Sequence, residues 1–391
     1  MLTPLDDLPV HQVAETMATV GTSDRNFYDR YYFNLHGSDG EFFLVGGLGQ
    51  YPNLGVTDAF VAVHHGSTQT VVRASRPLGP DRLDTTVGPL RVEVLAGLQR
   101  LRFTCEETDG FAMDLTWEGA IPAYEEPRML LAAPHGRILM NTMRFLQTGS
   151  WTGTLVLDGR EIAVTPDRFW GNRDRSWGVR PVGEPEPAGA PGMGTSGFFW
   201  NYFVARFPSS TLVYLVQEDG FGRRTLEEAV RLFPDGRVEH LGRAEHQLEF
   251  EPGTRMVTGA TITFRDGLVL RGQCLRPLHL ARGTGYGFDA DWRHGMWQGD
   301  QLVVQRHDFD TTGADMVPIP GAIVDHVASF TTNRDDEVGY GLLEVMTMGP
   351  HPQYFTGWDD LAADLAADLP GDGLAGDAAA PAADLVAGAA R

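Results

Sequence analysis

Aspartate-glycine pairs between short hydrophobic runs most restrict what this chain can fold into. They recur at Asp39-Gly40, Asp109-Gly110, Asp158-Gly159, Asp219-Gly220, Asp235-Gly236 and Asp266-Gly267. Both residue types tolerate a positive φ, so the pair is typical of a tight turn between two antiparallel strands. The runs between these turns are rich in aromatic and β-branched residues and show almost no helical periodicity. The pattern predicts an all-β fold of antiparallel hairpins.

The hairpin pattern is interrupted once and then begins again. Pro181–Pro191 is rich in Pro, Gly, Ala and Glu, which is typical of a linker. After it, an aromatic strand, a polar turn and an apolar strand return in the order seen from Phe27 onwards. We therefore expect two related β-domains, at residues 20–180 and 196–358, joined by a linker at 181–195. Residues 359–391 are rich in Ala, Asp and Gly, and we expect this tail to be largely disordered.

Composition excludes several classes of function. All 31 basic residues are arginine, and the missing lysine excludes Schiff-base aldolases, pyridoxal enzymes and Walker-type nucleotide sites. The formal net charge of −21 makes nucleic acids and anionic membranes poor partners. No run of about 18 apolar residues predicts a membrane span, and the first residues lack the pattern of a secretory signal. We expect a cytoplasmic protein without membrane insertion, whose partner is a small molecule.

The stretch Arg168–Arg180, RFWGNRDRSWGVR, combines bulky aromatic residues and arginines with a single carboxylate, Asp174. Arginine planes stack on aromatic faces and offset the cost of burying a carboxylate. Two interpretations stay open. The stretch is either a structural clasp that closes one half of the molecule, or a wall that places Asp174 in a pocket.

Two further regions carry candidate acid–base residues. Tyr286–Asp310 mixes aspartates and histidines with aromatic residues, an environment that shifts proton affinities, although solvated turns account for the same composition. Glu344 lies in an otherwise apolar strand, where a carboxylate is costly unless it is paired or faces a polar cavity. His351 and Tyr354 follow closely and are candidates for the same site.

The sequence offers no convincing metal or cofactor motif. GMGTSG, residues 192–197, has the spacing of the dinucleotide-binding fingerprint, but it follows a linker instead of a strand and precedes an aromatic strand instead of a helix. Cys105 and Cys274 lie far apart without partners at metal spacing, and we expect them to be buried apolar residues. None of the 12 histidines has the HExxH or a similar ligand spacing. We expect no metal and no cofactor, with a metal site assembled from distant positions as the open alternative.

The residues RDRSWG, together with FFWNYFVAR and LVYLVQEDG after the linker, resemble the carotenoid 1,2-hydratase/AttH-like superfamily. The resemblance implies two lipocalin-like β-barrels in tandem, at 20–180 and 196–358, that act on isoprenoid-like or other hydrophobic substrates without an organic cofactor. Asp174, Trp177 and Gly178 match the hydratase motif DHNWG, but Arg175 replaces its histidine. Tyr214 matches a second motif, whose aspartate is replaced by Val216.

Two functions follow as hypotheses. The first is a cofactor-independent enzyme that hydrates, dehydrates, isomerises or cyclises an isoprenoid- or polyketide-like molecule, as a hydratase, lyase, isomerase or cyclase, in a cavity near the domain junction. Its alternative is a non-catalytic carrier or binding protein for such ligands. The candidate catalytic residues are Asp174, Arg175 and Glu344. The candidate substrate-binding residues are Trp177, Trp200, Tyr202, Tyr214, His351 and Tyr354.

Overall fold

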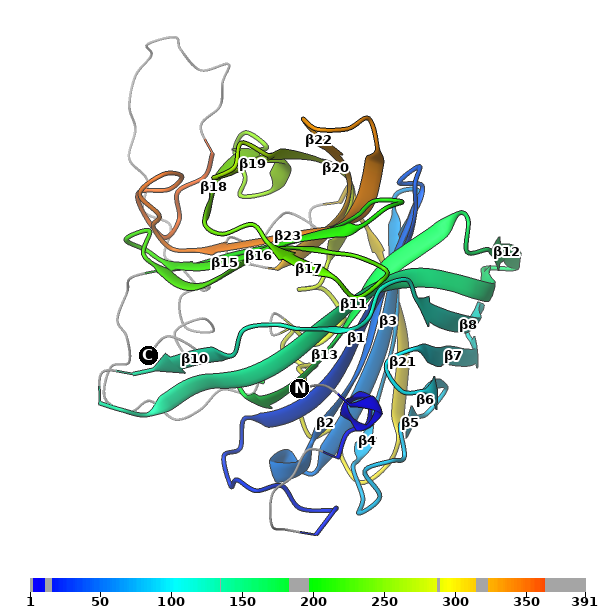
Figure 1. The fold of residues 1–391 in the computed structure, drawn as a ribbon. Helices are drawn as coiled ribbons and strands as arrows, with labels where there is room; N and C mark the ends of the chain where they lie inside the picture. The colour runs from blue at the N-terminus through cyan, green and yellow to red at the C-terminus, as the bar shows by residue number, and fades with distance from the viewer. Residues whose placement is uncertain are drawn as a thin grey trace, which may run out of the picture.

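The protein is built from β-strands in the computed structural model, which describes residues 3–10, 16–133, 135–182, 197–286, 289–313 and 323–362. Within these ranges the helical structure is limited to short 3₁₀ turns at Pro4–Asp7 (η1) and Pro52–Leu54 (η2) (Figure 1). No helix in the described ranges has the length and hydropathy needed to span a membrane. The predicted all-β fold is confirmed. Most of the expected linker and of the expected disordered tail lies outside the described residues.

The strands form two antiparallel sheets, each curled into a half-barrel (Figure 1). The central order of the first sheet is β21-β4-β3-β2-β1-β13-β11-β8-β7-β6-β5, with β9, β10 and β12 paired to β11. Its strands are Phe27–Gly37 (β1), Phe42–Tyr51 (β2), Val56–His65 (β3), Thr68–Pro77 (β4), Thr86–Val87 (β5), Leu90–Ala96 (β6), Arg100–Thr108 (β7), Phe111–Gly119 (β8), Tyr124–Glu125 (β9), Met129–Ala132 (β10), Ile138–Leu157 (β11), Arg160–Val164 (β12), Phe169–Val179 (β13) and Val303–Asp310 (β21).

The second sheet has the order β17-β16-β15-β14-β23-β22-β20-β19-β18. Its strands are Phe198–Arg206 (β14), Thr211–Asp219 (β15), Arg224–Leu232 (β16), Val238–His240 (β17), Ala244–Phe250 (β18), Val257–Phe264 (β19), Val269–His279 (β20), Val324–Thr332 (β22) and Val338–Met348 (β23).

Aspartate-glycine turns join neighbouring strands as the sequence pattern predicts. Asp109 and Gly110 connect β7 to β8 with φ values of 49° and 90°. Asp158 and Gly159 connect β11 to β12 with φ values of 49° and 81°. Two consecutive positive φ values are what a two-residue hairpin turn needs to follow the right-handed twist of its strands.

The segment between β20 and β22 crosses from the second sheet to the first. Its strand β21 pairs with β4, although it lies within the expected second domain. The preceding loop packs on the first sheet, where Asp58 accepts a hydrogen bond from the backbone nitrogen of Gly295 at 2.8 Å. This crossing carries Tyr286 to the space between the sheets, against Phe60.

Three large buried hydrophobic clusters and a small one around Tyr51 are found among the described residues. One fills the first half-barrel and includes Phe33, Phe103 and Trp151, and a second fills the other half-barrel around Phe203. The third lies between the sheets and combines side chains of both, such as Tyr32 and Leu342. Because β1 has apolar contacts on both faces, it is buried along its whole length. The first half-barrel is therefore filled with side chains, so the space for a ligand must be sought elsewhere.

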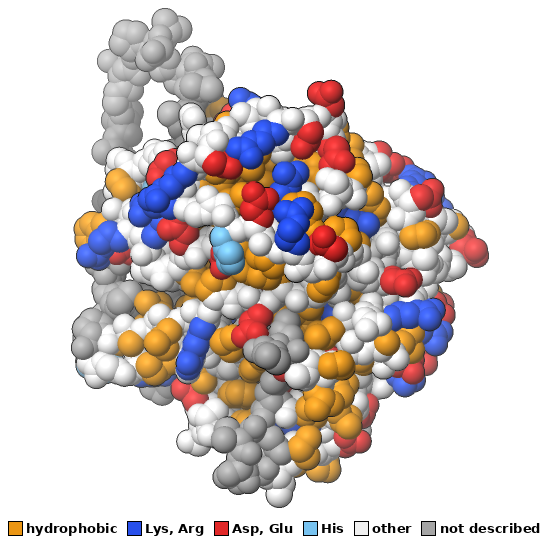
Figure 2. Space-filling model, viewed as in Figure 1, with side chains coloured by type: hydrophobic (Ala, Val, Ile, Leu, Met, Phe, Trp, Pro, Cys, Tyr) orange, Lys and Arg blue, Asp and Glu red, His pale blue; other side chains and the backbone are white. Residues whose placement is uncertain are grey.

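Arginines and acidic residues alternate on the surface of the second sheet. Figure 2 shows the two charge types interspersed over the upper part of this face. The exposed side chain of Arg334, for example, pairs with Asp266 at 2.7 Å. The negative net charge is thus not collected into one patch on this face.

Candidate active site

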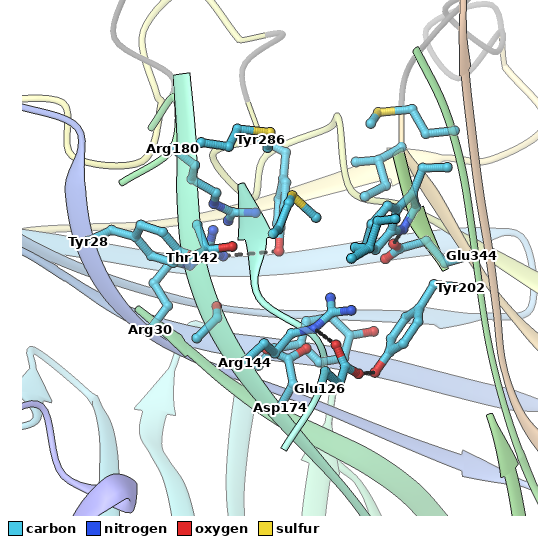
Figure 3. Close-up of a pocket in the computed structure, with 18 of the residues that line it drawn as sticks. Tyr28, Arg30, Glu126, Thr142, Arg144, Asp174, Arg180, Tyr202, Tyr286 and Glu344 are labelled. Carbon is cyan, nitrogen blue, oxygen red and sulfur yellow. Dashed lines mark hydrogen bonds and ion pairs between the residues drawn. The ribbon is translucent and has the colours of Figure 1, made fainter. Parts of the chain in front are cut away.

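A cavity of about 140 Å³, open to solvent at one side, lies between the two sheets (Figure 3). One wall comes from β1, β11 and β13 of the first sheet, and the other comes from β14 and β23 of the second. Apolar side chains line much of it, namely Met129, Met140, Phe198, Leu226, Ile323, Leu342 and Met346. A concave, mostly apolar space with a few polar groups is typical of a small-molecule site.

Strand β13 divides the arginine-rich motif between two faces, because successive side chains of a strand point in opposite directions. Arg173 and Arg175 point into the first half-barrel and form ion pairs with the buried carboxylates of Asp7 and Asp29. Asp174 points the other way and lines the cavity. The stretch therefore contains both a structural clasp and a pocket wall. Arg175 does not line the cavity, since its guanidinium lies on the opposite face of the strand.

Asp174 presents a carboxyl group to the cavity without a partner. Among the described residues, no side chain or backbone group forms a hydrogen bond or ion pair with it. Burial disfavours its charged form and raises its pKa from 3.8 to about 6. The positive charge of Arg144 opposes this rise, whereas the negative charges of Glu126 and Glu344 add to it. Asp174 is thus a carboxyl group that gains and loses its proton close to neutral pH.

Glu126 and Arg144 form a buried ion pair beside Asp174 (Figure 3). Arg144 Nε donates to Glu126 Oε2 at 2.5 Å, and the Tyr202 hydroxyl donates to Glu126 Oε1 at 2.8 Å. The guanidinium also stacks on the Tyr202 ring, 4.2 Å from its centroid. Burial raises the pKa of Glu126, and the Arg144 charge and the Tyr202 hydrogen bond counteract this rise. The pair fixes Tyr202 in the wall and leaves the Asp174 carboxyl free.

A second pair of carboxyl groups lies on the opposite wall. Glu344 and Asp325 are direct cross-strand neighbours on β23 and β22. The Trp200 indole donates a hydrogen bond to Glu344, and the Tyr32 hydroxyl donates to Asp325 at 2.5 Å. Burial, followed by repulsion from Glu344, raises the pKa of Asp325 well above its usual value. Glu344 is the member of the pair that lines the cavity.

The other end of the cavity is basic and phenolic (Figure 3). Arg30 Nη2 donates to the Tyr286 hydroxyl at 3.0 Å. The Arg180 guanidinium lies 4.6 Å from the centroid of the Tyr28 ring. Neither arginine forms an ion pair with a carboxylate of the described residues. A second, smaller hollow shares all four side chains, so the cavity extends past this end.

The structure brings together some of the residues singled out from the sequence. Asp174, Glu344, Trp200 and Tyr202 line one cavity. Trp177 does not line it, because it shares the barrel-facing side of β13 with Arg175; its ring contacts Phe145 edge-on.

Tyr214, His351 and Tyr354 form a separate group on the far side of β14. His351 and Tyr354 stack on Phe199, whose neighbour Trp200 points into the cavity. Tyr214 shares a hydrogen bond with His246 in this group. Because β14 separates the group from the cavity, these three residues do not line it. Of the described residues in the Tyr286–Asp310 region, only Tyr286 does.

Sequence reasoning missed four charged residues in or beside the site: Arg30, Glu126, Arg144 and Asp325. Arg30, Arg144 and Asp325 each lie in an apolar or aromatic strand, which is the signal that pointed to Glu344. A search of every predicted strand for a charged residue among apolar or aromatic neighbours therefore finds these three. Glu126 follows the two-residue strand β9 and has no comparable signal.

Comparisons with known proteins bear on the fold and the family. A family model described as a family of unknown function (DUF8625) matches residues 2–356. No curated protein matches the sequence. The fold is similar to that of an AttH-like protein from Nitrosomonas europaea, with a TM-score of 0.52 and 14% identity over 86% of this chain and 98% of that chain. The expected resemblance to the carotenoid 1,2-hydratase/AttH-like superfamily is thus confirmed for the double lipocalin-like fold.

Two further solved structures are similar at lower scores. Kievitone hydratase from Nectria haematococca has a TM-score of 0.44 and 13% identity, over 90% of this chain and 99% of that chain. CghA with Sch210972 has a TM-score of 0.45 and 11% identity, over 83% of this chain and 88% of that chain.

Proposed function

The chain belongs to DUF8625, a family of unknown function, and we propose that it is an enzyme that acts on a hydrophobic small molecule by acid–base chemistry of its own side chains. The reaction takes place in the cavity between the two sheets. It needs no organic cofactor and is a hydration, dehydration, isomerisation or cyclisation. The observation that carries the proposal is the unpartnered carboxyl group of Asp174, whose pKa of about 6 suits proton transfer near neutral pH.

The two walls supply complementary proton-transfer groups. In a hydration, protonated Asp174 donates its proton to the substrate. A water molecule adds to the carbon that becomes electron-poor, and the carboxylate of Glu344 takes the proton that this water loses. Exchange with solvent then restores both groups. Dehydration is the reverse, and an isomerisation needs only removal of a proton at one atom and its return at another.

The pKa of Asp174 limits the substrates that such an enzyme accepts. A carboxylic acid with a pKa of about 6 is too weak to protonate an isolated alkene at a useful rate. It is well matched to atoms whose proton affinity is increased by a neighbouring carbonyl, enol or phenol. The proposal therefore favours polyketide-like molecules with conjugated oxygen functions over unactivated isoprenoid hydrocarbons.

The basic end of the cavity supports a substrate that carries an acidic group. Arg30 and Arg180 are held against Tyr286 and Tyr28, respectively, and lack a carboxylate partner in the described residues. A carboxylate or enolate placed there gains charge-assisted hydrogen bonds in a partly dehydrated site. The substrate then lies with its acidic group at this end, its apolar body along the methionines, and its reacting atoms at Asp174.

The test begins with the protein as purified. Native mass spectrometry is expected to reveal a retained hydrophobic molecule, and a panel of conjugated enols, phenols and hydrophobic acids in D₂O is expected to incorporate deuterium or water. Asp174→Asn should bind the same molecules without turning them over, whereas Asp336→Asn, at an exposed site, should leave turnover unchanged. Binding without turnover by the wild-type protein supports the carrier alternative. Absence of both binding and turnover contradicts the proposal.

A further inference from the structure

A group of three metal-ligating side chains lies on the far side of β14 from the cavity. Glu218 is near the end of β15, His246 is on β18, and His351 is in the turn after β23. Their ligand atoms all lie within 4.8 Å of one another, and all three side chains are buried. Two imidazoles and a carboxylate that converge in this way are a donor set typical of zinc and related divalent ions.

The two histidines point their Nε2 atoms at the same carboxylate oxygen. His351 Nε2 lies 2.8 Å from Glu218 Oε2, and His246 Nε2 lies 3.7 Å from it. His246 is 6% exposed, and its Nε2 is buried without a hydrogen-bond partner. A buried polar atom without a partner is costly and needs an explanation. An ion bound between the three groups gives His246 Nε2 a partner.

The surroundings of the group orient its members. The Tyr214 hydroxyl lies 2.9 Å from His246 Nδ1, so with the proton on Nδ1 the Nε2 lone pair faces the centre of the group. Arg224 Nε donates to Glu218 Oε1 at 3.0 Å and leaves Oε2 for the group. The backbone nitrogen of Gln353 donates to His351 Nδ1 at 3.3 Å, so ligation through Nε2 requires Nδ1 to take the imidazole proton and this contact to be given up.

We propose that Glu218, His246 and His351 bind one divalent ion of the zinc type. Three protein ligands leave a fourth position for water, and a surface hollow lined in part by His246, Gln353 and Tyr354 adjoins the group. The ion is separate from the acid–base site, because Phe199 and strand β14 lie between the two.

The position of the ligands indicates what the ion does. β18 is one edge strand of the second sheet, and β15 lies toward its other edge. An ion held by Glu218 and His246 therefore joins the two sides of the half-barrel across its open seam. His351 adds the turn after β23 to the same clamp. Binding one ion in this way stabilises the folded chain relative to the unfolded chain, which has no assembled site.

The test uses the full-length protein after chelation and dialysis. Zinc is expected to rebind at one ion per chain and to raise the melting temperature, and Co²⁺ is expected to give the visible absorption bands of a nitrogen- and oxygen-ligated site. His246→Ala should abolish both effects, whereas His135→Ala, which removes an exposed histidine, should leave them unchanged. Tyr214→Phe removes only a hydroxyl and should weaken zinc binding about 10- to 100-fold.

Two results would overturn the assignment. One is wild-type protein that binds no zinc or Co²⁺ after chelation. The other is zinc binding that is as strong in His246→Ala and in Tyr214→Phe as it is in His135→Ala, because the bound ions would then be adventitious. If His246→Ala does not fold, the Tyr214→Phe measurement decides alone. Activity is not a readout here, so failure of the acid–base proposal leaves this test intact.

Discussion

Asp174→Asn is expected to make the protein inactive and more stable at the same time. Burial raises the pKa of Asp174 from 3.8 to about 6, so the folded protein holds this carboxyl group in its charged form at a cost once the pH exceeds 6. A shift of this size corresponds to about 3 kcal/mol, at about 1.4 kcal/mol per pH unit. Water in the cavity screens the charge and reduces the effect, so the figure is an upper limit.

The sign of the effect follows from the direction of the shift. A group whose pKa is raised on folding favours the folded state at pH values below its unfolded pKa, and this contribution is lost as the pH rises through its folded pKa. Asparagine stays neutral at every pH. The stability of Asp174→Asn relative to the wild type should therefore increase between pH 4 and pH 8, by up to about 3 kcal/mol.

Urea unfolding followed by tryptophan fluorescence measures this difference at a series of pH values. The comparison with the wild type cancels the titration of groups that do not interact with Asp174, and Asp336→Asn, at an exposed site, serves as the control. On a substrate found by the panel, turnover by Asp174→Asn should fall about 10²- to 10⁴-fold, the usual range for loss of a general acid or base. A variant that is destabilised equally at every pH would refute the reasoning, because Asp174 would then be a structural partner.

The remaining predictions concern the other charged groups of the cavity. Glu126→Gln leaves the Arg144 guanidinium buried without its carboxylate and should lower the free energy of unfolding by about 3–5 kcal/mol, measured by urea unfolding. A decrease of less than about 1 kcal/mol would contradict a buried ion pair. Asp325→Asn should maintain or increase stability at pH 7, because burial and the neighbouring Glu344 raise the pKa of Asp325 and so disfavour its charged form. Marked destabilisation at pH 7 but not at pH 4 would contradict this. Arg30→Gln combined with Arg180→Gln should weaken the binding of acidic ligands at least tenfold and leave the binding of neutral analogues unchanged, as measured by calorimetry. An equal loss of affinity for acidic and neutral ligands would contradict an anion subsite.

The fold could be predicted from local signals because hairpins are local structures. Pairs such as Asp109-Gly110 fix the turn, and alternation along β7 fixes which face is buried. The crossing of β21 to the first sheet could not be predicted in this way. Its pairing with β4 joins residues more than two hundred positions apart, and no turn signal encodes such a contact.

The candidate site could be predicted in part because a charged residue that is buried in a strand stands among apolar neighbours in the sequence. Glu344 and Asp174 stand out as carboxylates among apolar or aromatic neighbours, and both line the cavity. Their positions in the sequence do not show which side chains lie beside them in the folded protein. Arg175 adjoins Asp174 in the chain but occupies the opposite face of β13, whereas Arg144 faces the cavity from another strand. The partners of a strand residue lie on the strands beside it.

The most direct test of the account is a carboxyl ¹³C NMR titration of Asp174, with its signal assigned by comparison with Asp174→Asn. The account predicts a midpoint near pH 6 that shifts when a ligand fills the cavity. A midpoint at or below pH 4, unaffected by any ligand, would mean that the carboxyl group is solvated or paired, and the proposed acid would not exist.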